Sequence, residues 1–395
     1  MKNITMHVPT RIYFGKGQIE NLASSIKAYG NKVLFVYGGG SIKKTGLYDT
    51  VVEILNNNGI EFWELAGVTP NPKITTVREG VGICREHGIE VVLAVGGGSV
   101  FDCSKAIAAS VSYAGDPWDL VIKKGKVVSV LPVIVVSTLA ATGSEMDTSA
   151  VISNLETNEK LGLGHADMRP RAAILDPEYT MTVPKQFKAA GVVDIMSHVM
   201  EYYFNNYDTA GFQDRVGEAM LINTIEYGKK AYDDPNDYDA HANLLYTSVW
   251  ALTGLIGKGF PNQWTVHFLE QEISGYYNTT HGAGLAILIP QWFRYSVQFD
   301  STLPKFVDYG VNVWKIDPKG KTDREIAMLS IEATEDYFKS INMPSRLVEL
   351  NENITDEYFE EMADHIMSTV DNAALENCFV PLNRENILEM LRMCL

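Results

Sequence analysis

The 395-residue chain has few cysteines, no long apolar run and a deficit of positive charge. Cys84, Cys103, Cys378 and Cys394 are scattered without a Cys-x-x-Cys spacing, so neither a zinc cluster nor a disulfide framework is indicated. No apolar run reaches the roughly 20 residues that a membrane helix requires, and residues 1–7 carry no secretory signal pattern. These absences predict a cytoplasmic protein with reduced thiols.

Acidic residues outnumber basic ones, which gives a formal net charge of −16. Nucleic acids and anionic membranes repel a polyanion, so neither is expected as the main partner. The hydrophobic fraction of 46% is that of an ordinary globular chain, and the length allows two domains.

The first half of the chain alternates short apolar runs with helical patterns. Strands are expected at residues 32–37, 61–65, 91–95, 133–137 and 172–176. Helices are expected at residues 45–57, 74–86 and from the glycines at 96–98 through 109. This alternation predicts a mostly parallel sheet covered by helices.

Beyond Pro184 the strand-like bursts disappear and long amphipathic patterns replace them, at residues 214–229, 241–256 and 326–341. The chain is therefore expected to form an α/β N-terminal domain, residues 1–184, and an all-helical C-terminal domain, residues 185–395.

A glycine loop, Gly96-Gly97-Gly98-Ser99, stands between a predicted buried strand and a helix that carries Asp102. Successive glycines let the backbone approach a diphosphate, and the helix N-terminus offers free N–H groups. The spacing is neither G-x-G-x-x-G nor a P-loop, so a tight strand-to-helix turn is the alternative.

Two further loops follow predicted strands. Gly38-Gly39-Gly40-Ser41-Ile42-Lys43-Lys44 has no carboxylate to hold an adenosine ribose 2′-hydroxyl or to repel a 2′-phosphate, which predicts that NADP(H) is preferred over NAD(H). Residues 137–147 gather hydroxyls suited to a ribose and a carboxamide, although hydroxyls also cap helices.

A candidate metal pair lies at Asp194 and His198, in a stretch with helical apolar spacing. Four residues place the two side chains one turn apart on one helix face. A hydrogen-bonded pair inside a helical core is the alternative for these two residues alone. His267 on a second predicted helix and His281 at a loop-to-helix junction complete one carboxylate and three imidazoles, a set suited to Fe²⁺ or Zn²⁺.

The chain resembles the iron-containing (group III) alcohol dehydrogenase family, in its butanol dehydrogenase and broad-range aldehyde reductase branch. The motifs that carry the resemblance span nearly the whole chain: Phe14-Gly15-Lys16-Gly17, the loop at 38–44, Val-Gly-Gly-Gly-Ser-Val at 95–100, Ala-Thr-Gly-Ser-Glu at 141–145, Asp-x-x-x-His at 194–198, His267, and His281-Gly-Ala-Gly. The family's fold, an α/β nucleotide domain beside a helical metal domain, agrees with the boundary at 184.

The resemblance implies a reversible hydride transfer between nicotinamide and a small aldehyde or alcohol such as butanal or butanol. It implies Asp194, His198, His267 and His281 as ligands of one divalent metal. The cofactor positions it implies are Gly38, Gly39, Ser41, Gly97, Gly98, Ser99, Asp102, Thr138, Thr142 and Lys160. It also implies a homodimer joined through the strand at residues 11–14.

One position departs from the family pattern. A second histidine commonly stands four residues after the His267 position, beside the metal, where this chain has Gln271. Glutamine cannot titrate, so water or the cofactor ribose is expected to carry the proton in a reaction centred on His267 and Gln271.

Three other activities share parts of this pattern: a dehydroquinate synthase-like lyase, a polyol dehydrogenase, and a non-catalytic metal or nucleotide sensor. The lyase requires a strongly basic pocket for a phosphorylated, carboxylated substrate, and no Arg/Lys cluster accompanies the metal motifs. The residues around these motifs are aromatic instead, which favours an uncharged aliphatic substrate or plain helix packing: Trp250, Phe260, Trp264 and Phe268.

Overall fold

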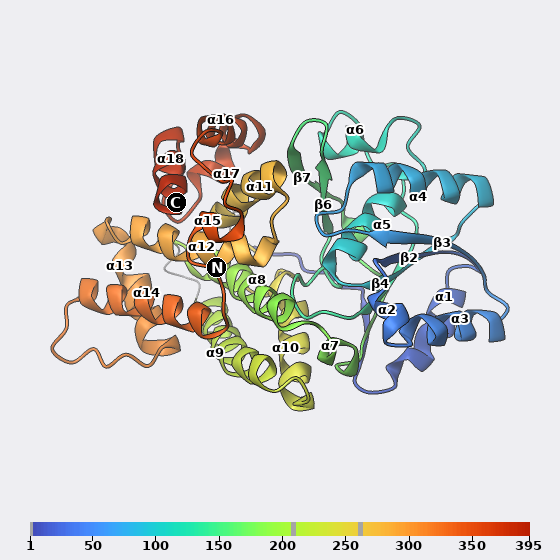
Figure 1. Ribbon diagram of the computed structural model, residues 1–395, viewed down its shortest axis with the longest axis horizontal. Helices are drawn as coiled ribbons and strands as arrows, with labels where there is room; N and C mark the ends of the chain where they lie inside the picture. The colour runs from blue at the N-terminus through green and yellow to red at the C-terminus, as the bar shows by residue number, and fades with distance from the viewer. Residues whose placement is uncertain (1–2, 207–210, 260–263) are drawn as a thin grey trace. The chain divides into compact units, whose positions relative to one another are not determined.

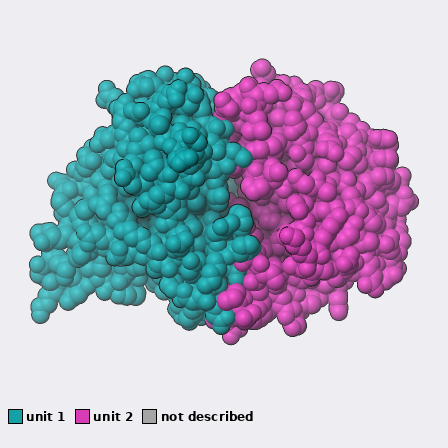
Figure 2. All heavy atoms as spheres, viewed as in Figure 1, with its two compact units in different colours: residues 1–6, 184–234, 254–395 teal, residues 7–183, 235–253 magenta. Residues whose placement is uncertain are grey.

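The computed structural model describes residues 3–206, 211–259 and 264–395. Its contacts divide the chain into two compact units, coloured in Figure 2. One unit, the sheet unit, consists of His7–Val183 and Pro235–Thr253. The other, the helical unit, consists of Pro184–Asp234 and Gly254–Leu395 together with Met1–Met6.

The compact units differ from the predicted ranges 1–184 and 185–395 at Pro184, in the N-terminal segment, and in the segment Pro235–Thr253 that contains α10 (Tyr238–Ala251). α10 follows the predicted boundary in sequence but packs within the sheet unit. His241 Nδ1 lies 2.8 Å from the hydroxyl of Thr180, and a Cβ at Gly143 would stand 2.7 Å from the carbonyl oxygen of Ser248. Chain order alone therefore does not assign this helix.

The sheet unit is built on a six-stranded parallel sheet in the order β1-β8-β5-β4-β2-β3 (Figure 1). The strands are β1 (Arg11–Phe14), β2 (Lys32–Gly38), β3 (Glu61–Val68), β4 (Val91–Gly96), β5 (Val133–Ser137) and β8 (Ala172–Leu175). The predicted parallel sheet is thus confirmed, with strand ends within three residues of those expected.

Helices cover both faces of this sheet (Figure 1). α1 (Leu22–Lys27) and α3 (Leu47–Asn57) pack on one face, where Phe35 and Leu93 belong to a fully buried core cluster. α4 (Ile74–His87) and α5 (Gly98–Ser110) cover the other. The predicted helix at 45–57 begins only at Leu47, because Gly46 adopts φ 81° and separates it from the short α2 (Ser41–Lys44). The remaining helices of this unit are α6 (Pro117–Val121) and α7 (Glu178–Met181).

A two-stranded antiparallel hairpin, β6 (Ser149–Asn154) and β7 (Glu159–Gly164), was not expected from the sequence. Its strands carry few large apolar residues, so the alternation that marks a half-buried strand is weak. The turn contains Asn158 with φ 55°, a conformation that asparagine tolerates.

The helical unit confirms the expected all-helical second half among the residues that the structure describes. Its longer helices are α8 (Lys185–Tyr203), α9 (Gly211–Asp233), α11 (Thr265–Tyr277), α12 (His281–Ser296), α14 (Asp323–Ser340), α16 (Phe359–Thr369) and α18 (Arg384–Met393). Shorter ones are α13 (Leu303–Asp308), α15 (Leu347–Leu350) and α17 (Asn372–Glu376). No helix in the described ranges has both the length and the apolar character to cross a membrane.

Candidate functional site

The three loops singled out in the sequence follow β2, β4 and β5, which are neighbours in the sheet. Because these strands are parallel, their carboxyl ends meet at one edge, the place where open α/β sheets bind ligands. Gly96 pairs with Ser137, and the amide of Thr138 donates to the Gly96 carbonyl at 2.9 Å. The fold therefore brings the loops at 38–44, 96–99 and 137–147 to a common edge.

Gly98 lies where the loop at 96–99 meets the loop at 137–147. A Cβ at this position would lie 2.3 Å from Cγ2 and 2.5 Å from Oγ1 of Thr142, closer than real side chains approach. Gly97 precedes α5 in an extended conformation and Gly98 is its first residue, while Ser99 and Thr142 are half-buried. The absence of a side chain at Gly98 thus lets the loop after β5 close over the start of α5.

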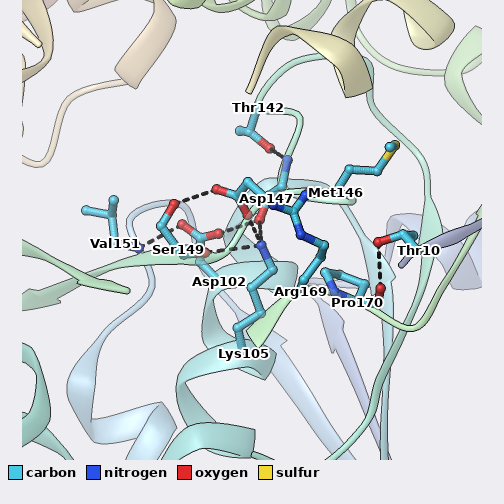
Figure 3. A network of polar contacts seen from close by, with 11 residues as sticks. Thr10, Asp102, Lys105, Thr142, Met146, Asp147, Ser149, Val151, Arg169 and Pro170 are labelled. Carbon is cyan, nitrogen blue, oxygen red and sulfur yellow. Dashed lines mark hydrogen bonds and ion pairs between the residues drawn. The ribbon is translucent and has the colours of Figure 1, made fainter. Parts of the chain in front are cut away.

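Asp102 points into a polar network beneath these loops (Figure 3). Its carboxylate accepts hydrogen bonds from the hydroxyl of Ser144 at 2.7 Å and from the amide of Val151 at 2.9 Å. Burial raises the pKa of Asp102 to about 6, and the nearby ammonium of Lys105 opposes that rise. Each carboxylate oxygen of Asp102 therefore links α5 to a neighbouring segment. This structural role is separate from the cofactor contact that the resemblance implies for Asp102.

The remaining predicted cofactor residues lie in two places. Gly38, Gly39 and Ser41 lie at the end of β2, where Gly39 and Ser41 are exposed. Lys160 is buried in β7, opposite Ser153 of the hairpin. Its side chain therefore belongs to the hairpin that the sequence did not predict.

The loop after β2 has a carboxylate near it that its own sequence lacks. Glu64 of the neighbouring strand β3 accepts hydrogen bonds from the hydroxyls of Tyr37 at 2.5 Å and Tyr48 at 2.8 Å. The ammonium of Lys43 lies 4.4 Å from the centre of the Tyr48 ring and 5.1 Å from that of Tyr37. Each oxygen of Glu64 thus has a tyrosine partner, and a lysine lies over the two rings.

Within the helical unit, Asp194, His267 and His281 offer ligand atoms that all lie within 4.8 Å of one another. They come from α8, α11 and α12. His198 adjoins this group: its Nε2 lies 3.5 Å from Asp194 Oδ1, and its ring stacks on that of His267 with centroids 4.8 Å apart. The four predicted ligands are therefore gathered in one place, three of them in mutual reach.

Asp194 shows that this group fits a cation. Its Oδ1 is buried and receives no hydrogen bond from any residue in the described part of the chain. The Nε2 atoms of His198 and His281 face this oxygen at 3.5 and 3.7 Å. Two ligands of a tetrahedral zinc ion stand about 3.4 Å apart, so the spacing suits a shared metal. The His281 side chain is 26% exposed, which leaves one side of the group open.

Two buried carboxylates that the sequence did not single out contact these histidines. Glu201 of α8 contacts Nδ1 of His267, and Glu270 of α11 contacts Nδ1 of His281. Burial raises the pKa of Glu201 well above its usual range, while its hydrogen bonds oppose that rise. For Glu201 a signal was present in the sequence, because it follows the apolar Val199 and Met200 in α8 and a buried glutamate requires a partner.

The neighbourhood of the group is partly aromatic. The Trp264 ring meets those of His198 and His267 edge-on, with centroids 6.0 and 5.1 Å away. Gln271 lies half-buried one turn after His267 on α11. Of the other predicted aromatics, Trp250 belongs to the sheet unit and Phe260 lies outside the described residues.

Family comparison agrees with both halves of this description. Residues 9–177 match the model of the iron-containing alcohol dehydrogenases, and residues 188–395 match the C-terminal model of the Fe-containing alcohol dehydrogenase family. The chain belongs to the iron-containing alcohol dehydrogenase family. It is accordingly an NAD(P)-dependent alcohol dehydrogenase, as the resemblance in the sequence implies.

Several relatives are similar over almost the whole chain. NADH-dependent butanol dehydrogenase A of Clostridium acetobutylicum is 50% identical over 392 residues, which cover 99% of each chain. The NADPH-dependent aldehyde reductase of Escherichia coli is 40% identical and covers 88% of this chain and 89% of its own. The crystal structure of a butanol dehydrogenase of Thermotoga maritima matches with a TM-score of 0.93 at 35% identity, covering 100% of this chain and 99% of its own.

Proposed function

We propose that this enzyme reduces small aliphatic aldehydes such as butanal, and oxidises the corresponding primary alcohols, at a metal held by Asp194, His198, His267 and His281. The observation that carries the proposal is the buried Asp194 Oδ1, which two imidazole nitrogens face at 3.5 and 3.7 Å and which accepts no hydrogen bond in the described chain. Support for the substrate comes from relatives whose names specify butanol or aldehyde.

When bound, Fe²⁺ or Zn²⁺ supplies a Lewis acid that favours negative charge on the substrate oxygen. Asp194 offers the only carboxylate of the ligand set and lowers the net charge of the site by one. His198, His267 and His281 are neutral ligands, and the Trp264 ring gives the group an apolar neighbour. Gln271 offers an amide but no titratable proton, so the proton comes from water or from the cofactor ribose.

The cofactor role of the sheet unit is proposed from its loops. The glycines at 96–98 and Ser99 stand at the start of α5, where the first backbone N–H groups have no acceptor within the helix and suit a diphosphate. Thr138 and Thr142 offer hydroxyls beside them. Gly39 and Ser41 lie exposed at the end of β2, where the adenosine ribose or its phosphate is expected.

The wild-type enzyme is expected to use NADPH with a higher kcat/KM than NADH in butanal reduction. Ser41→Asp should lower the NADPH-to-NADH ratio of kcat/KM by about tenfold, because a carboxylate in this loop repels a 2′-phosphate. Ser41→Asn, which has the same shape without the charge, is the control. The absorbance of the reduced nicotinamide measures both rates.

Two outcomes would contradict parts of this proposal. A wild-type preference for NADH would contradict the predicted NADP(H) preference. The test is stringent because two relatives are named NADH-dependent butanol dehydrogenases. Binding of cofactor and metal without turnover of butanal would favour a sensor over an aldehyde reductase.

We further propose a homodimer in which β1 (Arg11–Phe14) pairs with its copy. Among the described strands β1 is at the edge of the sheet and pairs with β8, so its other edge offers backbone groups to a further strand. Light scattering after size exclusion should give twice the 43.8 kDa chain mass, and Ile12→Pro should reduce it. A monomeric wild type would contradict this assembly.

The cytoplasmic location stays a prediction, which cell fractionation tests.

A further inference from the structure

We propose that Glu201 and Glu270 are positioning residues of the metal site, each holding one histidine ligand in the tautomer and direction that metal binding requires. The inference rests on the metal role proposed above for Asp194, His267 and His281. It concerns two fully buried carboxylates that act through the histidine rings they contact.

Glu201 fixes both the His267 ring and the start of the helix that carries it. One carboxylate oxygen contacts Nδ1 of His267, and the other accepts a hydrogen bond from the amide of Val266 at 2.7 Å. Val266 lies in the first turn of α11, where backbone N–H groups lack partners within the helix, and the preceding Trp264 provides no side-chain cap. Glu201 therefore serves as the cap as well as the partner of the ring.

Glu270 holds His281 in a comparable way from α11. Its carboxylate contacts Nδ1 of His281, the first residue of α12. Gly284 provides the space, since a Cβ there would lie 3.0 Å from Cγ of Glu270. A Cβ at Gly282 would lie 2.1 Å from the carbonyl oxygen of Ala190 in α8, so the first turn of α12 also packs directly on α8.

These contacts connect the three ligand-bearing helices in a closed order. α8 supplies Glu201 to the histidine of α11, α11 supplies Glu270 to the histidine of α12, and α12 packs back against α8. Both glutamates are fully buried, at 0% exposure, so their partners are protein groups rather than bulk water. The position of each ring is thus determined by a helix other than its own.

The chemistry of imidazole explains the role. A neutral imidazole carries one proton, and a carboxylate at Nδ1 keeps that proton there and leaves the lone pair on Nε2. Nε2 of His281 is the atom that faces Asp194 Oδ1. A glutamine in place of either glutamate would present an N–H group to Nδ1 and favour the proton on Nε2, where it blocks metal binding. Loss of such a partner typically costs 10–100-fold in metal affinity.

The chain offers a matched control on the same helix. Glu272 of α11 is 5% exposed and contacts Nδ1 of His365 at 2.8 Å. His365 lies outside the group formed by Asp194, His267 and His281. Glu272→Gln therefore makes the same chemical change to a buried glutamate whose half-buried histidine partner is not a proposed ligand.

The test measures Zn²⁺ affinity of the metal-free full-length protein, by competition with a chromophoric chelator, without cofactor or substrate. Glu201→Gln and Glu270→Gln should each raise the Kd about 10–100-fold, and Glu272→Gln should change it less than about twofold. The visible spectrum of bound Co²⁺ should change in the first two variants only. Circular dichroism of each metal-free variant verifies its fold.

A double variant keeps the test decisive if a single change disturbs the fold. Glu201→Gln should lower Zn²⁺ affinity in the wild type but not further in the His267→Ala protein, because the effect passes through that ring. An equal loss in both backgrounds, or an unchanged Kd in both folded single variants, would overturn the inference. Wild-type protein that binds no Zn²⁺ would overturn the proposed metal site as well, whereas unchanged variants of a metal-binding wild type overturn this inference alone.

Discussion

Asp194→Ala should lower kcat/KM for aldehyde reduction by at least about a thousandfold. The substitution removes the only carboxylate from the proposed ligand set and leaves three neutral imidazoles, so metal affinity falls. Loss of the Lewis acid removes several kcal/mol of transition-state stabilisation, and about 4 kcal/mol corresponds to a factor of about a thousand in rate. Steady-state rates together with elemental analysis of the purified protein measure both effects.

The same variant should still bind the reduced cofactor. Asp194 belongs to the helical unit, whereas the glycine loops belong to the sheet unit, so nicotinamide fluorescence should report an unchanged Kd. Asp233→Asn removes an exposed carboxylate at the end of α9 and serves as the control. Full activity of Asp194→Ala, or of wild-type enzyme after chelation of its metal, would contradict the proposed mechanism.

The sheet was predictable because its central strands are short runs of Val, Ile and Leu bounded by glycine or hydroxyl residues. The hairpin β6–β7 was not, since a stretch such as Ser149–Asn154 mixes small, polar and apolar residues and its pairing depends on the register with Glu159–Gly164. The sequence also did not predict that α10 packs within the sheet unit. Its amphipathic pattern predicts a helix but not the unit against which its apolar side packs.

Some residues of the candidate site could be predicted from local sequence, and others depend on contacts between distant parts of the chain. Asp194 and His198 could be paired because helical spacing alone puts them on one face. Their meeting with His267 and His281 requires three helices to pack together, which the combination of motifs indicated but no single spacing did. Glu201 and Glu270 were missed because each contacts a histidine on another helix: the apolar setting of Glu201 indicates that it needs a partner, but local sequence does not identify that partner.

Lys105→Met should destabilise the sheet unit by about 3–5 kcal/mol, the usual cost of leaving a buried charge without its partner. The Lys105 side chain is fully buried and contacts Asp147 (Figure 3). Its ammonium also donates to the hydroxyl of Ser144 at 2.8 Å and to the carbonyl of Ser149 at 3.1 Å. Without it, the carboxylates of Asp147 and Asp102 would share a buried region with no counter-charge from α5. Thermal unfolding should show a lowered Tm, by about 10 °C or more.

The loss of stability in Lys105→Met should grow with pH, and a second substitution should partly restore the Tm. The fold raises the pKa of Asp102 to about 6 from 3.8, so the stability that this group contributes is present below pH 4 and disappears as pH rises through 6. Lys105 opposes that rise, so its removal raises the pKa further and makes Lys105→Met most unstable, relative to wild type, at pH 8 rather than at pH 5. Lys105→Met combined with Asp147→Asn should recover part of the lost Tm, because the pair is then removed together. Equal Tm values for wild type and Lys105→Met at both pH values would show that this buried lysine does not hold the loop after β5 to α5.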